Sequence, residues 1–387
     1  MLQKKLSKCC QSCKFSPFDT NLIAVGTSKN FGFTGPGELV ILHYDSNTFF
    51  NRSLISNNNY SQSFIKEIKS FFINDTILDC AWSEKEDSII IGAIGNGTIP
   101  IYKLENYTEN ISSTPNIQYP IHILQGHKQE ISTVDWNIYQ KNLVLSASWD
   151  MSLKIWDMEQ LKCITTLENA HNGPIYAAAF SPLHPNIISS VGLDWKLNIS
   201  DARVIKPRSS FNKETQFSRS NVTETFNNKI QINSQISCTA HEQKVLCLDW
   251  NKYNPFIICT GAADGSIKLW DLRKLKQTNE RGQPILSIQA HKLAVSKTKF
   301  NPFSECIISS CSYDMTIKIW KITNLSDIIE LTSQDLNSSK LQYFINNFHI
   351  HHTEFILGLD WNLFEKDLIC SASWDKTICL WKTMNEH

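Results

Sequence analysis

Hydrophobic and polar residues alternate in short runs along this chain, and polar turns separate the runs. Examples are the segments from Ile131 to Trp136, from Val245 to Trp250 and from Ile356 to Trp361. A period of two over about six residues is typical of β-strands that bury one face. The pattern therefore predicts a protein built from many short strands.

The runs belong to a repeated skeleton of a histidine, an alternating segment, a hydroxyl residue, an aspartate and a tryptophan. In five copies the aspartate follows the histidine by 23 residues, and in four of them a tryptophan follows the aspartate by six. The five sets are His127, Ser146, Asp150, Trp156; His171, Ser190, Asp194, with Ser200 in the tryptophan position; His241, Thr260, Asp264, Trp270; His291, Ser310, Asp314, Trp320; and His352, Ser371, Asp375, Trp381. Such equal spacing indicates a structural repeat.

The recurrence of this set favours a structural role. A buried aspartate beneath a tight turn needs hydrogen-bond donors, and a histidine and a hydroxyl can supply them while an indole N–H anchors the far end. Serine, histidine and aspartate together also suggest a catalytic triad. Because every regular repeat carries the same set, we interpret it as bracing and predict that the protein is not an enzyme.

The set resembles that of the WD-repeat family, in which each repeat forms a four-stranded blade and the blades surround a channel. Two degenerate units complete the ring, one aligned on Phe15 and one on Trp82. The resemblance implies an all-β, single-domain, seven-bladed WD-repeat β-propeller over residues 1–387. We expect the segment from Leu2 to Leu6 to supply the outer strand of the last blade and close the ring.

The predicted repeats cover residues 8–72, 73–124, 125–168, 169–239, 240–289, 290–348 and 349–387. Asn/Ser-rich insertions at about residues 45–63, 103–119, 203–235, 275–283 and 325–343 are expected to form loosely ordered loops. In this family such loops, between the third and fourth strands, share the bottom face. We therefore place the ligand site on the opposite, top face.

The amino-acid composition limits the classes of partner that the protein can bind. The 37 basic residues balance the 37 acidic ones, so no overall field attracts nucleic acid. No apolar run approaches the roughly 18 to 20 residues of a membrane span, and no secretory signal follows Met1. The 12 cysteines are scattered through strand-like segments, which is typical of reduced thiols in the cytosol. We expect no nucleic-acid partner and no direct membrane insertion.

Cys10 and Cys13, with Cys9 beside them, have the spacing of a metal or redox motif. Alignment with the other repeats places Cys10 where Ile131 lies and Cys13 where Val134 lies. These are core positions, so we interpret both thiols as small core residues and predict neither a metal nor a cofactor.

Two groups of residues are predicted to line the top face. Acidic residues occur at the start of three innermost strands, namely Asp75, Glu130 and Glu354. Apolar or aromatic residues precede four of the turn aspartates, namely Trp149, Leu193, Tyr313 and Trp374. Carboxylates beside an apolar platform suit a basic amphipathic helix. The alternative is an ordinary solvated rim on which the aromatic rings pack against neighbouring blades.

Several segments outside the generic repeat resemble a narrower family, the peroxins that act as receptors for type-2 peroxisomal targeting signals. These segments are Phe15-Ser16-Pro17-Phe18, the run from Asn30 to Leu42, the run from Cys247 to Asn254, the run from Ser310 to Asp314, and the run from His351 to Asp360. The resemblance implies binding of an N-terminal amphipathic helix with Arg-Leu near its start and His-Leu or Gln-Leu one to two turns later. By the same resemblance, Asp75 and Glu130 receive the basic residues of the signal and the apolar platform receives its leucines.

The resemblance also implies the partners and the location. The partners are cargo proteins with a type-2 signal, a peroxin co-receptor and peroxisomal docking peroxins. The protein is expected in the cytoplasm, cycling to the peroxisome, and as a monomer on its own.

The alternative is a WD-repeat scaffold such as a histone-binding chaperone subunit or a ubiquitin-ligase substrate adaptor. A histone-binding subunit would show a long N-terminal helix and an acidic insertion beside the last blade, and neither pattern occurs here. Because Ser200 replaces the tryptophan and a long insertion follows it, we expect the fourth blade to be the least well formed of the seven.

Overall fold

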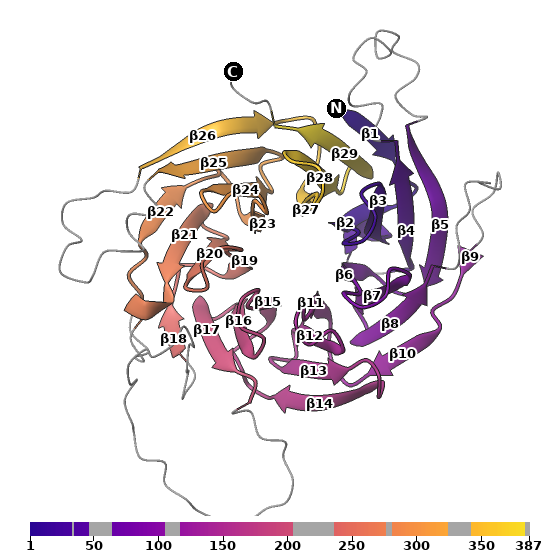
Figure 1. The fold of residues 1–387 in the computed structure, drawn as a ribbon, viewed down its shortest axis with the longest axis horizontal. Coiled ribbons are helices and arrows are strands. Elements are labelled where there is room, and N and C mark those ends of the chain that lie inside the picture. Colours follow the sequence, from indigo (N-terminus) through magenta and orange to yellow (C-terminus); the bar gives the residue numbers. More distant parts are fainter. Residues whose placement is uncertain are drawn as a thin grey trace, which may run out of the picture.

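The computed structural model describes residues 1–32, 35–45, 64–104, 117–203, 236–275, 281–323 and 342–383. Over these ranges the strands form seven mainly antiparallel sheets, which stand as blades around a central channel (Figure 1). The same ranges contain two short 3-10 turns, η1 (Asn30–Gly32) and η3 (Leu272–Lys274), and no α-helix. The fold is the predicted all-β, seven-bladed propeller.

The strands of each blade are given from the channel outwards. Blade 1 has β2 (Cys9–Phe15), β3 (Leu22–Ser28), β4 (Gly37–Tyr44), β5 (Ile65–Ile73) and β9 (Ile117–Gln118), and blade 2 has β6 (Ile77–Trp82), β7 (Ile89–Ile94), β8 (Thr98–Lys103) and β10 (His122–Gln125). Blade 3 has β11 (Ile131–Trp136), β12 (Leu143–Ser148), β13 (Leu153–Asp157) and β14 (Lys162–Leu167), and blade 4 has β15 (Ile175–Phe180), β16 (Ile187–Gly192), β17 (Lys196–Asp201) and β18 (Ile236–Thr239). Blade 5 has β19 (Val245–Trp250), β20 (Ile257–Ala262), β21 (Ser266–Asp271) and β22 (Leu286–Gln289), and blade 6 has β23 (Val295–Phe300), β24 (Ile307–Ser312), β25 (Ile317–Thr323) and β26 (Gln342–His349). Blade 7 has β27 (Ile356–Trp361), β28 (Leu368–Ser373), β29 (Thr377–Lys382) and β1 (Leu2–Lys5).

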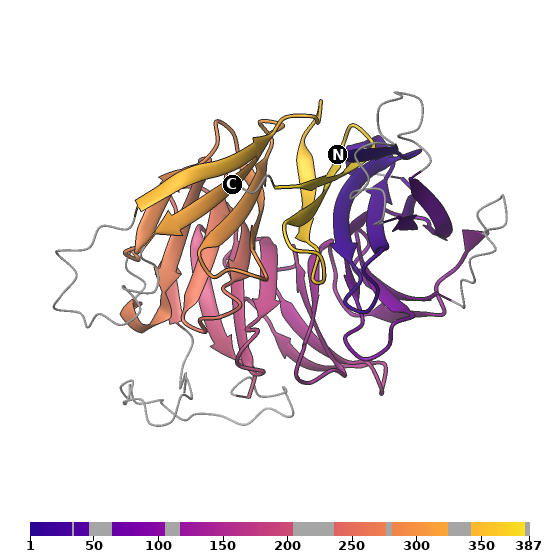
Figure 2. The same ribbon diagram turned by 45° about the horizontal axis from the view of Figure 1, so that its top comes forward.

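The ring is closed by the first strand of the chain. β1 pairs antiparallel with β29, from Leu2 opposite Leu380 to Lys5 opposite Thr377. Figures 1 and 2 show β1 lying along blade 7, so that residues from both ends of the sequence share one sheet. This confirms the predicted closure by the N-terminal segment.

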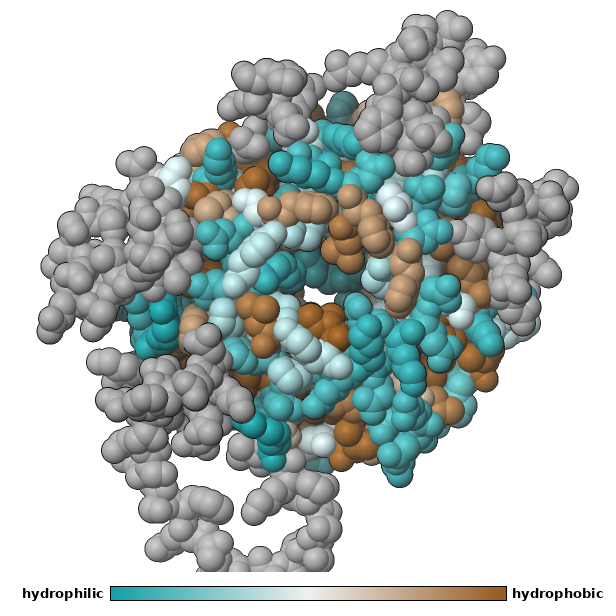
Figure 3. All heavy atoms as spheres, in the orientation of Figure 1, coloured by the Kyte–Doolittle hydropathy of each residue, from teal (hydrophilic) through white to brown (hydrophobic). Residues whose placement is uncertain are grey.

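The hydrophobic core lies between neighbouring blades. The cluster between blades 7 and 1 contains Cys10, Cys13, Phe15 and Cys370, all of them buried. Cys10 and Cys13, which have the spacing of a metal motif, are therefore part of the hydrophobic core between two blades. Hydrophobic side chains also surround much of the channel mouth on the face seen in Figure 3.

The two flat faces differ in the turns that form them. Because neighbouring strands are antiparallel, the starts of the inner strands and the turns between the second and third strands lie on one face, which we call the top face. The turns between the first and second strands lie on the opposite, bottom face. An inner strand of six residues spans about 20 Å, which separates the two faces.

Most of the predicted insertions lie outside the described residues, which omit 46–63, 105–116, 204–235, 276–280 and 324–341. Several of their edges differ from the prediction. Lys103 ends β8, Ile117 and Gln118 form β9 parallel to β5, and Gln342 begins β26. Leu275 caps η3, and Arg281 forms a β-bridge with Thr239. The predicted repeat boundaries after residues 72, 124 and 348 fall one residue before the ends of β5, β10 and β26, because backbone pairing continues to that residue.

Candidate binding surface

The five recurrent sets form buried hydrogen-bonded chains inside their blades. In blade 3, His127 Nδ1 is 2.9 Å from Asp150 Oδ2, and His127 Nε2 is 2.7 Å from Ser146 Oγ. Trp156 Nε1 donates to the same serine hydroxyl at 2.8 Å. The histidine, serine and tryptophan are buried, so this chain links β12 and β13 to the loop before β11 through groups that water does not reach.

The electrostatics fit this bracing role. Burial alone would raise the pKa of Asp375, but hydrogen bonds from His352 and Thr377 outweigh it and lower that pKa to about 2. In blade 5 the same balance, with donors His241 and Ser266, lowers the pKa of Asp264 to about 2. The turn aspartates are thus ionised acceptors in the folded protein, each held by several donors.

Three blades depart from this pattern. In blade 5, His241 Nδ1 is 3.4 Å from Asp264, farther than His127 is from Asp150, and it also lies 3.0 Å from Ser266 Oγ. In blade 4, Asn198 Nδ2 approaches His171 Nε2 at 3.2 Å, while Ser200 occupies the position of the missing tryptophan. Blade 4 nevertheless forms all four strands. In blade 7, Trp381 Nε1 has no hydrogen-bond partner among the described residues.

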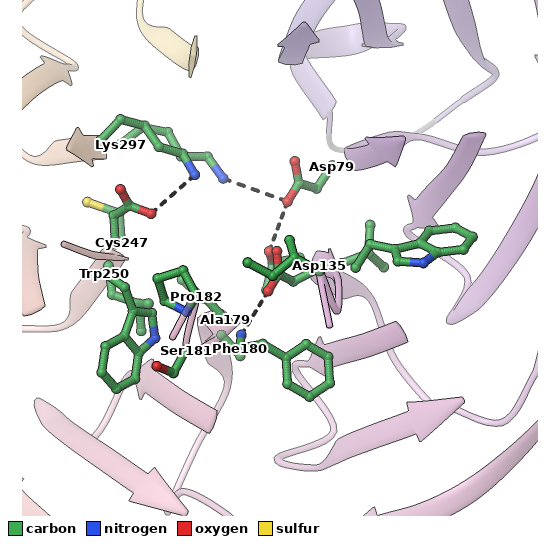
Figure 4. Close-up of a pocket in the computed structure, with 18 of the residues that line it drawn as sticks. Asp79, Asp135, Ala179, Phe180, Ser181, Pro182, Cys247, Trp250 and Lys297 are labelled. Carbon is green, nitrogen blue, oxygen red and sulfur yellow. Dashed lines mark hydrogen bonds and ion pairs between the residues drawn. The ribbon is translucent and has the colours of Figure 1, made fainter. Parts of the chain in front are cut away.

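The channel is crossed by an ion pair between opposite blades. Asp79 Oδ2 on the inner strand of blade 2 is 3.9 Å from Lys297 Nζ on the inner strand of blade 6, and it also accepts from Thr133 Oγ1 at 2.8 Å (Figure 4). Asp135 lies nearby and accepts the backbone N–H of Phe180 in the next blade at 2.7 Å (Figure 4). These charges tie inner strands together across and around the channel.

The top face brings one predicted carboxylate and one predicted aromatic residue to the same corner. The backbone N–H of Trp149 donates to the backbone carbonyl of Glu130 at 2.9 Å, so the turn of blade 3 is bound to the start of its inner strand. Trp149 remains 38% exposed even though its ring packs edge-on against Tyr176 of blade 4, 6.2 Å between centroids. This corner therefore carries Trp149 and Glu130 on two backbone segments that are hydrogen-bonded to each other.

The other two carboxylates lie on blades 2 and 7 of the top face. Asp75 is half-buried two residues before β6, where its Oδ1 accepts the backbone N–H of Thr76 at 2.7 Å. Glu354 is exposed two residues before β27. Within the described ranges neither these two nor Glu130 forms an ion pair, so all three remain available to cations.

Tyr313 and Trp374 are held differently from Trp149. Tyr313 stacks on Phe355 with centroids 4.6 Å apart, and Phe355 in turn lies 5.3 Å from Trp374. Trp374 also contacts the ring of Phe31, and its Nε1 donates to Gln11 Oε1 at 3.2 Å. These aromatic rings from blades 6, 7 and 1 pack on one another, which agrees for this part of the face with the alternative of blade-to-blade packing.

Two exposed apolar residues of the top face were not predicted from the sequence. Met151 and Trp195 follow the turn aspartates of blades 3 and 4, and with Trp149 and Leu193 they form an arc whose exposed fractions lie between 37% and 47%. Both have positive φ angles, 67° and 66°, at the position where Gly97 and Gly265 stand in other blades. The signal that could have identified them is a large apolar residue where a turn favours glycine.

Comparison with known proteins agrees with this architecture. The family model described as "WD domain, G-beta repeat" matches residues 118–157, 161–201, 233–271, 282–321 and 343–382, more than half of the chain. The chain therefore belongs to the WD-repeat family, and its fold defines it as a seven-bladed β-propeller.

Its relatives are more specific. The chain is similar to the "Peroxisomal targeting signal 2 receptor" of Saccharomyces cerevisiae, 27% identical over 95% of each chain. A protein of the same name from Schizosaccharomyces pombe is 23% identical over 96% of each chain. The human protein of that name is 28% identical over 46% of this chain and 47% of its own length. The resemblance to this group of receptors that the sequence predicted is thus confirmed.

Proposed function

We propose that the protein is a receptor for type-2 peroxisomal targeting signals and that it binds the signal helix on its top face. The names of its relatives support a role in peroxisomal targeting. The observation that carries the proposal is the corner of blade 3 where the turn that bears the exposed indole of Trp149 is hydrogen-bonded through its backbone to Glu130. A basic amphipathic helix needs both chemistries within the width of one helix.

The geometry favours one position on the top face for the apolar side of the signal helix. The arc of Trp149, Met151, Leu193 and Trp195 on blades 3 and 4 is exposed, whereas Tyr313 and Trp374 on blades 6 and 7 are half-buried by their aromatic neighbours. The leucines of the signal then lie on the exposed arc. Its basic residues face Glu130 and Asp75, with Glu354 as the third carboxylate of the face.

The rest of the proposed role follows from the receptor assignment. Cargo proteins that carry the signal are bound in the cytoplasm, a peroxin co-receptor and docking peroxins act at the membrane, and the receptor cycles. No helix of the described residues has the length and apolarity needed to cross a membrane.

The proposal is tested by titrating the purified chain against a fluorescent peptide with Arg-Leu near its start and His-Leu further on. We expect specific binding, and we expect Asp75→Ala with Glu130→Ala to weaken it at least about tenfold, because each charge-assisted contact contributes about 1.5 to 3 kcal/mol. A scrambled peptide is the control. Equal binding of both peptides, or an affinity that the double variant leaves unchanged, contradicts the proposal.

A further inference from the structure

The turns on the bottom face share one construction in all seven blades. The residue directly after each inner strand is a buried serine or asparagine, namely Ser16, Ser83, Asn137, Ser181, Asn251, Asn301 or Asn362. Its side-chain oxygen accepts backbone N–H groups two or three residues further on. Asn362 Oδ1, for example, accepts from Phe364 at 2.8 Å and from Glu365 at 2.7 Å. These caps hold each turn in one conformation.

The caps also join neighbouring blades. Asn137 Nδ2 donates to the carbonyl of Pro185 at 2.8 Å, Asn251 Nδ2 to that of Glu305 at 2.9 Å, and Asn362 Nδ2 to that of Thr20 at 3.0 Å. Each bond reaches the corresponding turn of the next blade. At these three junctions the bottom turns of neighbouring blades are therefore fixed to each other.

This construction directs two rings of side chains outwards. The first residue after each cap lines a single cavity of about 280 Å³ at the bottom mouth of the channel; these residues are Pro17, Glu84, Ile138, Pro182, Lys252, Pro302 and Leu363. The second residue is apolar in six blades; these residues, which we call the bottom crown, are Phe18, Tyr139, Leu183, Tyr253, Phe303 and Phe364. Five of the six are aromatic, with exposed fractions between 38% and 53%. The cavity itself is lined by both apolar and charged side chains, Glu84 and Lys252 among them. An exposed apolar ring around such a cavity is the composition of an interaction site.

The charges around the crown restrict the partner. The seven turns, from each cap to the residue before the second strand, contain the carboxylates of Asp19, Glu84, Glu86, Asp87, Glu305, Glu365 and Asp367 against the amines of Lys85, Lys141, Lys252 and Lys366. Two of the amines are already committed, because Lys85 pairs with Glu159 at 2.6 Å and Lys252 with Asp249 at 3.0 Å. One of the carboxylates is committed as well, because Glu365 pairs with Lys382 at 2.9 Å. The rim is thus acidic, which attracts basic groups and repels an anionic membrane.

We propose that the bottom crown is a second docking surface, for a protein segment that presents bulky apolar side chains flanked by lysine or arginine. The apolar side chains pack on the crown and enter the cavity, and the basic residues meet the acidic rim. The site lies about 20 Å from the top face, so both faces can be occupied at once. It does not depend on the cargo that the top face binds.

The test uses the purified full chain and two amphipathic helical probe peptides. Both carry leucine and phenylalanine on one side, with lysine on the other side in the first peptide and glutamate in the second. The measurement is fluorescence anisotropy in the presence of a saturating type-2 signal peptide. We expect the lysine peptide to bind at least about tenfold tighter than the glutamate peptide, and we expect Tyr139→Ser with Phe364→Ser to weaken it by a similar factor.

Control variants separate this site from other effects. Ile164→Ser removes an exposed apolar side chain of similar exposure on β14 and should leave the affinity unchanged. Tyr253→Ser with Phe303→Ser repeats the test with a different part of the crown, in case the first pair perturbs folding. Glu84→Lys with Glu86→Lys should weaken binding of the lysine peptide. Asp75→Ala with Glu130→Ala reports on the top face alone, so failure of the proposed receptor function leaves the crown measurement intact.

Three results would overturn the inference. They are equal affinity for the two peptides, affinity that both crown pairs leave unchanged, and sedimentation of the protein with phosphatidylcholine vesicles that the crown variants abolish. The last result would identify the crown as a lipid-contact surface instead.

Discussion

The imidazole of His349 stacks on the indole of Trp381, with ring centroids 4.7 Å apart and planes inclined by 11°. His349 ends the outer strand of blade 6, and Trp381 lies on the third strand of blade 7, so the stack joins two blades. His349 Nε2 and Trp381 Nε1 are both buried without a hydrogen-bond partner in the described part of the chain. Burial, with His351 and His352 nearby, lowers the pKa of His349 to about 3.

This stack predicts a loss of stability in mild acid. The unfolded chain binds a proton at His349 below pH 6.5, whereas the folded protein does not until about pH 3. The contribution is therefore complete above pH 6.5 and is lost as the pH falls towards 3, by about 1.4 kcal/mol at pH 5.5. His349→Phe keeps an aromatic ring on Trp381 but cannot titrate. The free energy of unfolding, measured with urea between pH 7.5 and 5, should fall less steeply in the variant. Parallel curves for the two proteins would contradict this account.

The hydroxyl residues of the recurrent sets should differ in their contributions to stability. Ser310 Oγ contacts His291 at 2.8 Å and accepts the N–H of Trp320 at 2.9 Å, whereas Ser371 Oγ contacts only His352 among the partners described for it, at 2.9 Å. Removing Ser310 leaves two buried groups unsatisfied. We expect Ser310→Ala to cost about 2 to 4 kcal/mol and Ser371→Ala about 1 to 2 kcal/mol. Chemical denaturation of both variants checks the difference, and a larger cost at Ser371 would show that the order is wrong.

A substitution of Trp195 should lower the affinity for the signal peptide without lowering the stability of the fold. Its φ of 66° is a conformation that glycine adopts without strain, and its side chain is 47% exposed. Trp195→Gly is expected to leave the unfolding midpoint unchanged or to raise it slightly, because the backbone strain is relieved. Its affinity for the type-2 signal peptide should fall several-fold, because part of the apolar arc is lost. Lys376→Gly, at the matching turn of blade 7, is the control for the backbone effect. Full affinity in Trp195→Gly would remove this residue from the proposed site.

The ion pair across the channel should show coupling in a double-mutant cycle. Burial raises the pKa of Asp79, but Lys297, Lys14 and the Thr133 hydroxyl together lower it below its usual range. Lys297→Met removes the nearest compensating charge and should destabilise the protein by about 2 kcal/mol. Asp79→Asn with Lys297→Met should cost at least about 1 kcal/mol less than the sum of the single variants. Additive costs in urea denaturation would mean that the two charges act independently.

Most of the fold could be predicted from local patterns in the sequence, namely the alternation within strands and the spacing of the repeat. The alternation from Ile131 to Trp136 recurs in every inner strand, and the spacing from His127 to Asp150 fixes the register of a repeat without any knowledge of distant contacts. The closing strand was also predictable, because too few residues follow Trp381 to complete a blade. Such features depend on neighbours in the sequence or on the count of a repeat.

Features that depend on contacts between blades were not predictable in this way. Nothing in the sequence relates Asp79 to Lys297, which meet only because the ring brings blades 2 and 6 to opposite walls of one channel. The stack of His349 on Trp381 likewise needs the packing of two blades. On the top face, Trp149 and Glu130 were predicted separately from their places in the repeat, and the hydrogen bond that joins them came from the structure. Their role in binding stays a prediction.

The pairing of β1 with β29 sets the order in which the molecule can be completed during synthesis. Residues 2–5 are made before the first blade, but their partners, residues 377–380, are made only after the strands of six blades have been synthesised. Until then blade 7 lacks its other strands, and β1 has an unsatisfied edge to offer. A chaperone that shields this edge would act on the nascent protein, and the seam between the first and last blades is where folding finishes.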